Sequence, residues 1–150
     1  MNKKQICEKF GGKLTNGSCK INGFNMDIEG GRGQIVFGFR PNTQQFKIMP
    51  PKEFLNLVPK DPFRENVERK ERLKKIIKQQ KSPVDPLWLD VNVDTCEVLR
   101  HEGRGRATAS KELGLKKVPV VIFNREIEDN EEFPTTRKNK CKRFISQRSK

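Results

Sequence analysis

The chain has 150 residues, of which 33% are hydrophobic, and 32 Lys and Arg against 19 Asp and Glu give a formal net charge of +13. This length excludes two large domains and predicts one domain with a modest core and appended ends. No apolar run is long enough for a signal peptide or a membrane span, so we expect a cytoplasmic protein without a membrane partner. The charge favours a polyanion, and DNA is the partner that we expect first. A nucleotide, an anionic membrane surface or a thermophile's surface composition would account for the same charge.

Residues 1–45 are predicted to form an N-terminal extension made of a short helix and an antiparallel β-meander. Gly11 would end the helix, and Asn16-Gly17 is the strongest short signal for a hairpin. Alternating apolar residues predict further strands over 24–28 and 35–39. The glycine-rich stretch between these strands is interpreted as a plain turn, because it lacks the lysine and the following helix of a P-loop.

The four cysteines are Cys7, Cys19, Cys96 and Cys141, and no two of them are closely spaced. A zinc site therefore has little support, and the sequence identifies no metal. Cys7 and Cys19 flank the predicted hairpin turn, so a disulfide between them is one alternative. Reduced thiols are the other alternative, and they are the default inside a cell.

Residues 46–124 are predicted to form the core of the domain. Pro50 and Pro51 would start a short helix that Pro59 ends. A second helix is predicted over 61–81, with a narrow apolar stripe and a densely charged remaining face. This charged face has two interpretations: a solvated surface with charge pairs one turn apart, or a surface that follows phosphates.

The next elements are expected in the order strand, strand, helix, strand. LWLDV predicts a buried strand, and a turn near Asn92 and Asp94 joins it to the strand-like CEVLRH. RGRATASKEL predicts a helix that stops at Gly114, before the apolar strand VPVVIF.

The turn between the second strand and the helix holds most of the candidate site residues. Gly103 and Gly105 would let backbone N–H groups approach an anion, and the following helix adds its positive end. Arg104 and Arg106 supply planar guanidinium groups that suit bidentate contacts with phosphate. The sequence therefore predicts a phosphate- or nucleotide-binding turn.

Glu102 and His101 precede these residues, and each has two interpretations. A carboxylate beside phosphate is repelled unless it accepts hydrogen bonds, holds a metal or removes a proton, and a histidine could share the last task. In this interpretation both residues are catalytic candidates. In the alternative, Glu102 pairs with Arg104 or Arg106, and His101 is a strand-end histidine with a satisfied ring.

DPLWLDVNVDTCEVLRHEGRGRATASKELGLKKVPVVI resembles the segment that defines the ParB/sulfiredoxin superfamily, in which a strand ends in a G-x-x-R type turn that opens a helix leading to a V-P-V strand. The upstream IMPPKEFLNLVP is similar to the segment that precedes this core in small ParB-like nuclease domains of mobile elements. The resemblance covers Ile48 to Ile122. It implies an α+β fold, in which a ParB/sulfiredoxin-like core with a small mixed sheet and helices follows the N-terminal β-meander.

In that family the turn and the helix start bind phosphates of DNA or of a nucleotide, so the resemblance implies CTP or ATP with Mg²⁺ as cofactors. Members include CTP-dependent DNA-partition clamps, nucleases, and ATP-using relatives that act on cysteine sulfinates or serine. Sulfinate reduction also needs a cysteine in the turn, and Cys96 lies before it in the strand. We therefore do not expect that reaction.

The resemblance assigns phosphate-binding roles to Gly103, Arg104 and Arg106. Glu102 matches the acidic position of many such turns, and His101 matches the first histidine of an H-E-G-R-H-R form. Gly105 stands where that form has its second histidine, so we expect reduced catalysis or none, with anion binding retained.

Residues 125–150 are predicted to form a charged, flexible tail. An acidic stretch, EIEDNEE, precedes residues 137–150, which hold seven Lys or Arg and no acid. Such a block either contacts phosphates or is simply solvated, and Phe144 within it could stack on an unpaired base. The candidate nucleic-acid-binding residues of the tail are Arg137, Lys138, Lys140, Lys142, Arg143 and Arg148.

The leading hypothesis is a ParB-like DNA-binding protein that uses the turn for phosphate and the tail for further backbone contacts. If it cuts DNA, a divalent metal near Glu102 with His101 as proton carrier is the mechanism to test. One alternative is a nucleotide-dependent enzyme such as a small-molecule kinase. Another is a catalytically lapsed adaptor of a virus or plasmid. The sequence is compatible with a monomer and with a homodimer.

Overall fold

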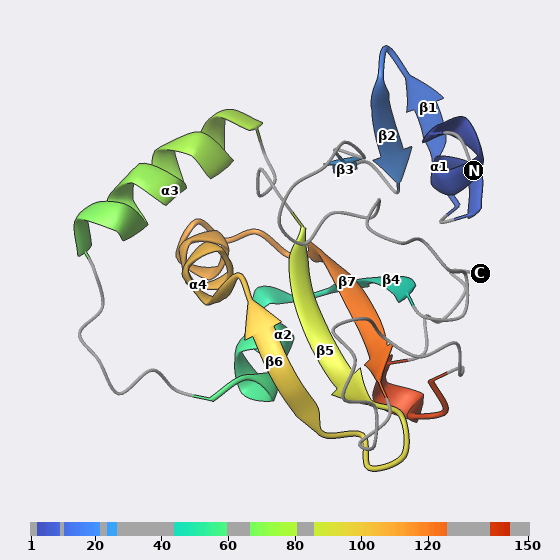
Figure 1. The fold of residues 1–150 in the computed structure, drawn as a ribbon. Coiled ribbons are helices and arrows are strands. Elements are labelled where there is room, and N and C mark those ends of the chain that lie inside the picture. The colour runs from blue at the N-terminus through green and yellow to red at the C-terminus, as the bar shows by residue number, and fades with distance from the viewer. Residues whose placement is uncertain are drawn as a thin grey trace.

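A computed structural model describes residues 3–9, 11–21, 24–26, 44–59, 67–80, 86–125 and 139–144 (Figure 1). The elements, in chain order, are α1 Lys3–Lys9, β1 Lys13–Thr15, β2 Ser18–Ile21, β3 Phe24–Met26, β4 Gln44–Met49, α2 Pro51–Leu57, α3 Val67–Gln80, β5 Leu87–Asn92, β6 Val98–Glu102, α4 Arg104–Glu112, β7 Val118–Arg125 and a 3₁₀ turn, Lys142–Phe144. The fold is α+β, with one three-stranded antiparallel sheet and one four-stranded mixed sheet. The predicted α+β class is confirmed.

The three-stranded sheet begins with the hairpin that the sequence predicts. β1 pairs with β2 so that Leu14 lies opposite Cys19, and the turn places Asn16 at φ 50° and Gly17 at φ 80°. Positive φ at both central residues is the geometry that Asn-Gly turns favour. β3 then pairs with β2. The remainder of the predicted meander, including the glycine-rich turn, falls on residues 27–43, which lie outside the described residues.

The four-stranded sheet has the order β4-β7-β5-β6. β5 runs parallel to β7, and the other pairs are antiparallel. LWLDV forms the almost fully buried β5, as its apolar character predicts. β4 begins at Gln44, so the sheet starts just before residue 46, where the sequence analysis placed the start of the core.

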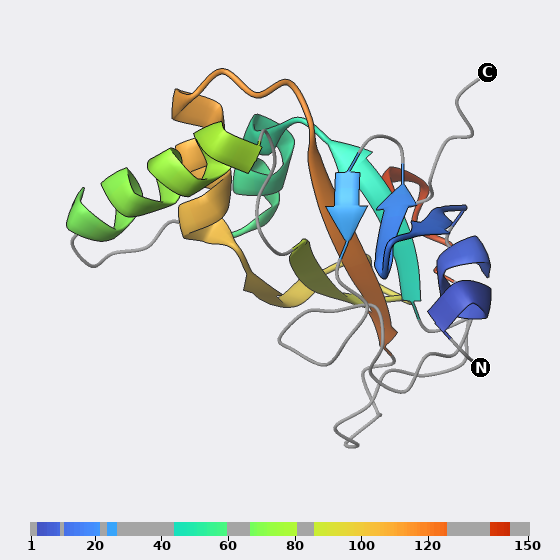
Figure 2. The ribbon, with the colours of Figure 1, turned by 90° about the horizontal axis from the view of Figure 1, so that it is seen from above.

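The four-stranded sheet is covered on both faces. On one face, β-strand side chains pack with residues of α2 and α4; this core includes Phe54, Leu87, Leu89 and Ala107. On the other face, the buried hydrophobic residues are Cys7, Cys19, Ile21, Phe46 and Val121. Figure 2 shows the resulting three layers, with α2, α3 and α4 on one side of the sheet and α1, β1 and β2 on the other. We call these sides the helical face and the N-terminal face.

Two disulfides are present, Cys7–Cys19 and Cys96–Cys141. The first is the pairing that the sequence left open, and the second was not predicted. Gly12 packs so closely on the first that an added Cβ would lie 2.7 Å from Cys19 Sγ. Disulfides occur in oxidising compartments and inside hyperthermophiles, and the cytoplasmic location remains a prediction.

Part of the predicted flexible tail is packed against the domain. Residues 139–144 are held by the disulfide at Cys141, and Phe144 is fully buried in the core of the helical face. Gln45 Nε2 donates to Phe144 O at 2.8 Å, and Lys47 Nζ donates to Arg143 O. Burial of Phe144 corrects the expectation that this ring could stack on a base.

α2 and α3 differ in how closely they match their predicted bounds. α2 follows Pro50 and ends before Pro59, as predicted. α3 is described from Val67, and residues 61–66, where the sequence places the helix start, lie outside the described residues. Within the described ranges, no helix combines the length and the apolar character needed to cross a lipid bilayer.

Candidate functional site

Gly103 sets the geometry of the passage from β6 into α4. It is the N-cap residue of α4 and has φ 115° and ψ 12°, a conformation that glycine adopts readily and other residues avoid. A Cβ at this position would lie 2.4 Å from Leu87 Cδ2, so the close approach of β5 also requires glycine. Gly103 O accepts the first helical hydrogen bond, from Ala107 N at 2.8 Å.

The N-terminus of α4 lacks the groups that usually neutralise a helix start. Among the residues that the structure describes, no side chain caps the helix, and its first turn contains no acidic residue. The first N–H groups of a helix have no partner within the helix, and they carry the positive end of its dipole. Gly105 is exposed, so this end is accessible from solvent. The arrangement suits an anion.

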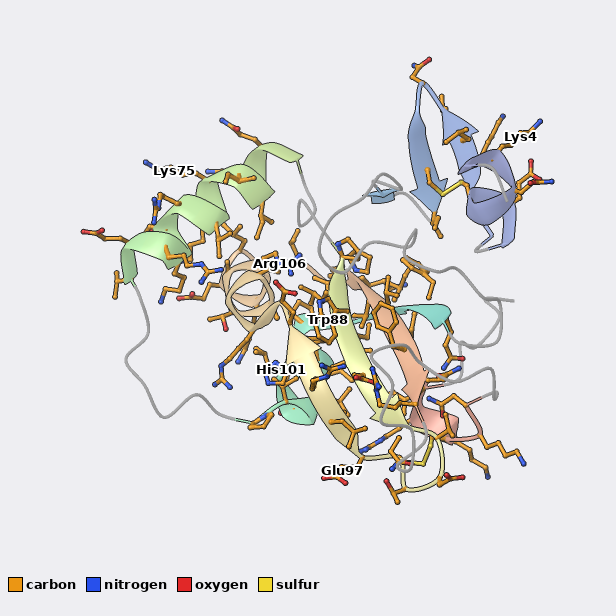
Figure 3. All side chains as sticks on the ribbon, viewed as in Figure 1. Lys4, Lys75, Trp88, Glu97, His101 and Arg106 are labelled. Atoms are coloured by element: carbon orange, nitrogen blue, oxygen red, sulfur yellow. A yellow bond between two sulfur atoms is a disulfide. The ribbon has the colours of Figure 1, made fainter. Side chains whose placement is uncertain are left out.

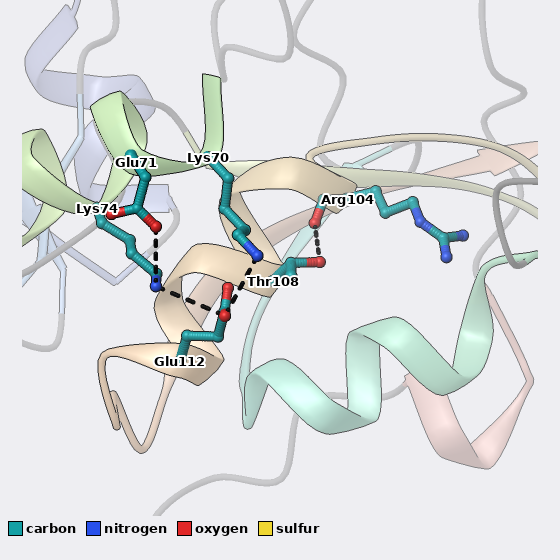
Figure 4. Close-up of polar contacts among 6 residues, drawn as sticks. All are labelled: Lys70, Glu71, Lys74, Arg104, Thr108 and Glu112. Atoms are coloured by element: carbon teal, nitrogen blue, oxygen red, sulfur yellow. Dashed lines mark hydrogen bonds and ion pairs between the residues drawn. The ribbon is translucent and has the colours of Figure 1, made fainter. Parts of the chain in front are cut away.

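Arg104 and Arg106 lie on opposite sides of the α4 N-terminus. Residues two apart on a helix project about 200° from each other. Arg104 Nη1 donates to Pro59 O after α2, and Arg106 Nη1 donates to Pro86 O before β5 at 3.1 Å. Figure 4 shows the Arg104 side chain directed toward α2. The two guanidinium groups therefore flank the helix start, and they do not converge on one point.

Glu102 points away from the helix start. Its cross-strand partner on β5 is Trp88, which packs against the core of the N-terminal face. Trp88 Nε1 donates to Glu102 Oε2 at 2.6 Å, and the indole makes an edge-to-face contact with Phe123 at 5.9 Å between ring centroids. The carboxylate is thus on the face of the sheet opposite α4, where it does not repel an anion at the helix start.

His101 lies on the helical face, because its cross-strand partner is Leu89. The side chain is half-buried, and among the described residues no hydrogen-bond partner is found for its buried Nδ1 atom. Burial lowers the pKa of His101 below its ordinary value of 6.5, and the nearby Arg104 charge lowers it further. The ring is therefore neutral at pH 7.

The structure separates the two catalytic candidates. Successive residues of a strand point to opposite faces, so a metal ion held by Glu102 would lie across the sheet from the His101 ring. In the described part of the chain, no cluster of three or more His, Cys, Asp or Glu could hold a metal ion. The predicted binding residues Gly103, Arg104, Gly105 and Arg106 share the α4 N-terminus with His101.

Asp90 is a charged group that the sequence analysis did not single out. Its side chain is 2% exposed and lies between two arginines, with Arg100 Nη2 at 3.0 Å and Arg125 Nε at 2.8 Å from Oδ2. The Asp90 carboxylate thus links β5 to β6 through Arg100 and to β7 through Arg125. Two features of the sequence could have indicated this buried charge. One is the acidic residue inside the apolar stretch LWLDV, and the other is the strand alternation that puts Asp90 and Trp88 on the same face of the sheet.

The basic residues of the tail are only partly within the described residues. Lys140, Lys142 and Arg143 are exposed, and the Arg143 guanidinium lies 4.8 Å from the centroid of the Phe144 ring and donates to Cys96 O. The other candidates, Arg137, Lys138 and Arg148, lie outside the described residues.

Comparison of the chain with protein-family models, with curated proteins and with solved structures finds no match. A function for this protein is therefore inferred from the positions and charges of its residues.

Proposed function

We propose that the protein binds the phosphate backbone of DNA, with the N-terminus of α4 and the 101–106 turn as its phosphate site. The observation that carries this proposal is the uncapped start of α4, which follows Gly103 and has Arg104 and Arg106 on either side. Backbone N–H groups, the helix dipole and two guanidinium groups all favour an anion at this place.

Two further observations support an anion site. Trp88 binds the Glu102 carboxylate on the face of the sheet opposite α4, so this negative charge is kept away from an anion at the helix start. The net charge of +13 favours long-range attraction of a polyanion. These groups recognise phosphate and not base edges, so the DNA binding that we propose is independent of sequence.

A nucleoside triphosphate offers phosphates to the same groups. The ParB/sulfiredoxin resemblance, with CTP or ATP and Mg²⁺, therefore belongs to this proposal as a competitor for the site. The proposal does not include DNA cleavage, because His101 and Glu102 lie on opposite faces of β6. Nor does it rest on Phe144, whose ring is buried.

Gly105 offers a direct test. A Cβ at this position would lie 3.4 Å from Leu73 Cδ1, an ordinary van der Waals contact, so an added Cβ is accommodated. Gly105→Glu places a carboxylate in the first turn of α4, where it favours the helix but repels phosphate. Gly105→Gln is the matched control, because it has the same shape without the charge.

The measurement is the affinity of each variant for labelled duplex DNA across a salt series. We expect Gly105→Glu to bind at least about tenfold more weakly than Gly105→Gln, although its thermal stability should be equal or slightly higher. Pyrophosphate, CTP and ATP with Mg²⁺ should each compete with DNA. Equal affinities of the two variants, or affinity of the wild type that does not fall with salt, would contradict the proposal.

A further inference from the structure

The helix α3 packs against α4 and also carries more positive than negative charges. Its sequence, VERKERLKKIIKQQ, holds six Lys or Arg and two Glu. Ile77 is buried and Leu73 is half-buried, and α3 packs against α4. Leu73 and Ile77 are therefore packed inside the protein, whereas Val67 is 60% and Ile76 is 38% exposed.

The lysines nearest α4 are neutralised. Lys70 Nζ and Lys74 Nζ lie 3.3 and 3.5 Å from Glu112 Oε1 of α4, and Lys74 also lies 3.4 Å from Glu71 (Figure 4). In these ion pairs Glu112 and Glu71 neutralise Lys70 and Lys74. They do not neutralise the positive charges on the side of α3 that faces away from α4.

Three cations lie on that opposite side, Arg72, Lys75 and Lys78, and we call them the outer face of α3. The exposed Glu68, four residues before Arg72, lies on the same side. All three cations are exposed, and among the described residues no ion pair is found for them. They repeat every third residue, so they follow one another along the helix. Figure 3 shows Lys75 directed away from the rest of the molecule.

α3 itself lies beside the candidate phosphate site. Leu73 of α3 lies next to Gly105, in the first turn of α4. A polyanion at the α4 N-terminus therefore passes close to α3. Arg72 to Lys78 span about 9 Å along the helix, and their long side chains extend this reach to neighbouring phosphates of a DNA strand.

We propose that the outer face of α3 is a second phosphate-contacting surface for the duplex that binds the 101–106 turn. The inference rests on the proposed function and adds a named surface to it. Duplex DNA fits the observations better than single strands, because α3 has no aromatic side chain on which an unpaired base could stack. It also fits better than a membrane, because Leu73 and Ile77 are packed inside the protein, which leaves α3 without a continuous apolar face for lipid.

The test compares two triple variants that remove the same charge. One is Arg72→Gln, Lys75→Gln and Lys78→Gln, on the outer face of α3. The control is Lys4→Gln, Lys13→Gln and Lys20→Gln, which changes three exposed lysines of the N-terminal face. Each variant changes the net charge from +13 by −3 to +10. The N-terminal elements and α3 lie on opposite sides of the sheet (Figures 2 and 3).

The readout is the slope of log affinity against log salt for duplex DNA. Each lost phosphate contact reduces this slope by about 0.9, so we expect the α3 variant to lose about 2.7 and to bind on the order of 100-fold more weakly at about 0.1 M salt. The control should keep the wild-type slope. Circular dichroism and the thermal midpoint should be the same for all three proteins, because the substituted side chains are exposed.

The outcomes separate the two proposals. Equal losses in both triple variants would show that affinity follows net charge, and would overturn the α3 inference. An unchanged α3 variant alongside a weakened Gly105→Glu protein would overturn this inference and leave the proposed function standing. A wild type that binds no duplex DNA at low salt would overturn both.

Further arms of the same assay test the choice of partner. Duplex RNA, single-stranded DNA and vesicles containing anionic lipid replace the duplex DNA. We expect the α3 substitutions to weaken duplex DNA binding most. Tighter wild-type binding to any of the other three would overturn the assignment to duplex DNA.

Discussion

Gly103 and Glu102 are neighbours in the chain, but Gly103 forms the start of the candidate site and the Glu102 side chain points away from it. The positive φ of Gly103 follows from a local signal, because glycine between a strand and a helix start permits this conformation. Its phosphate-binding role remains a prediction. The direction of Glu102 is not local, since it depends on the pairing of β6 with β5. That pairing includes an irregularity between Asp90 and Val91, which shifts the register. A shift of one residue exchanges the faces of all following side chains, so only the structure could place this carboxylate.

His101 makes a prediction about pH. Its folded-state pKa is lowered by burial and by Arg104, whereas in the unfolded chain it is about 6.5. Below that value the unfolded chain takes up a proton more readily than the folded protein. The free energy of unfolding should therefore fall as the pH drops from about 7.5 to about 5, and rise again when the pH is raised.

The measurement is urea unfolding over this pH range, with His101→Gln as control. The control should lose the part of the pH dependence that falls near pH 6. Since His101 is the only histidine, NMR titration of its ring gives the pKa directly, and added pyrophosphate should raise it by offsetting the Arg104 charge. A ring pKa at or above 6.5 in the free protein would contradict the prediction.

Among the elements, those with local signals were predicted best. The Asn16-Gly17 hairpin, the proline-bounded α2 and the glycine stop after α4 all follow from a few adjacent residues. The C-terminal segment was not predicted, because its contacts with Cys96 and Gln45 join residues far apart in the sequence. Its high charge was typical of a flexible arm, and no nearby residue indicated that Phe144 is buried.

The Cys96–Cys141 disulfide makes a prediction about this segment. It closes a loop with a sequence separation of 45, which corresponds to about 4 kcal/mol of stabilisation through the unfolded state. The Cys96→Ser, Cys141→Ser variant should lose about that amount in urea unfolding without reductant. The pair Cys7→Ser, Cys19→Ser is the control for a shorter loop, with a separation of 12, and should lose about 3 kcal/mol.

Mass spectrometry after alkylation of the unfolded, unreduced wild type provides the matching check. No cysteine should react, since the structure has no free thiol. Reaction of Cys96 and Cys141, together with an unchanged stability of their double variant, would show that this bond is absent in solution.

The whole molecule is organised by the two faces of its four-stranded sheet. The helical face carries the α4 N-terminus and α3, which we propose for DNA. The N-terminal face is covered by a disulfide-bonded unit that contributes Cys7, Cys19 and Ile21 to its core. This division could not be predicted from the sequence, because the two segments that cover the sheet carry no signal for the face on which each one packs.

Removal of residues 1–21 should uncover the N-terminal face. Phe46 and Val121 are buried there, and Trp88 and Phe123 pack against them. An exposed apolar surface of this kind favours association and lowers stability. We expect the truncated protein to bind a hydrophobic fluorescent dye and to melt at a lower temperature than the full chain. A truncated protein that stays dye-free with an unchanged midpoint would show that the unit does not cover this face.

The hydrogen bond between Trp88 and Glu102 has an experimental consequence of its own. The chain has one tryptophan and no tyrosine, so its intrinsic emission comes from a single indole. That indole contacts the residue immediately before Gly103, at the start of the proposed phosphate site. Any ligand that shifts the end of β6 changes the surroundings of this chromophore. The protein therefore carries a built-in optical reporter of its candidate site, and unlabelled DNA or nucleotides can be titrated by fluorescence alone.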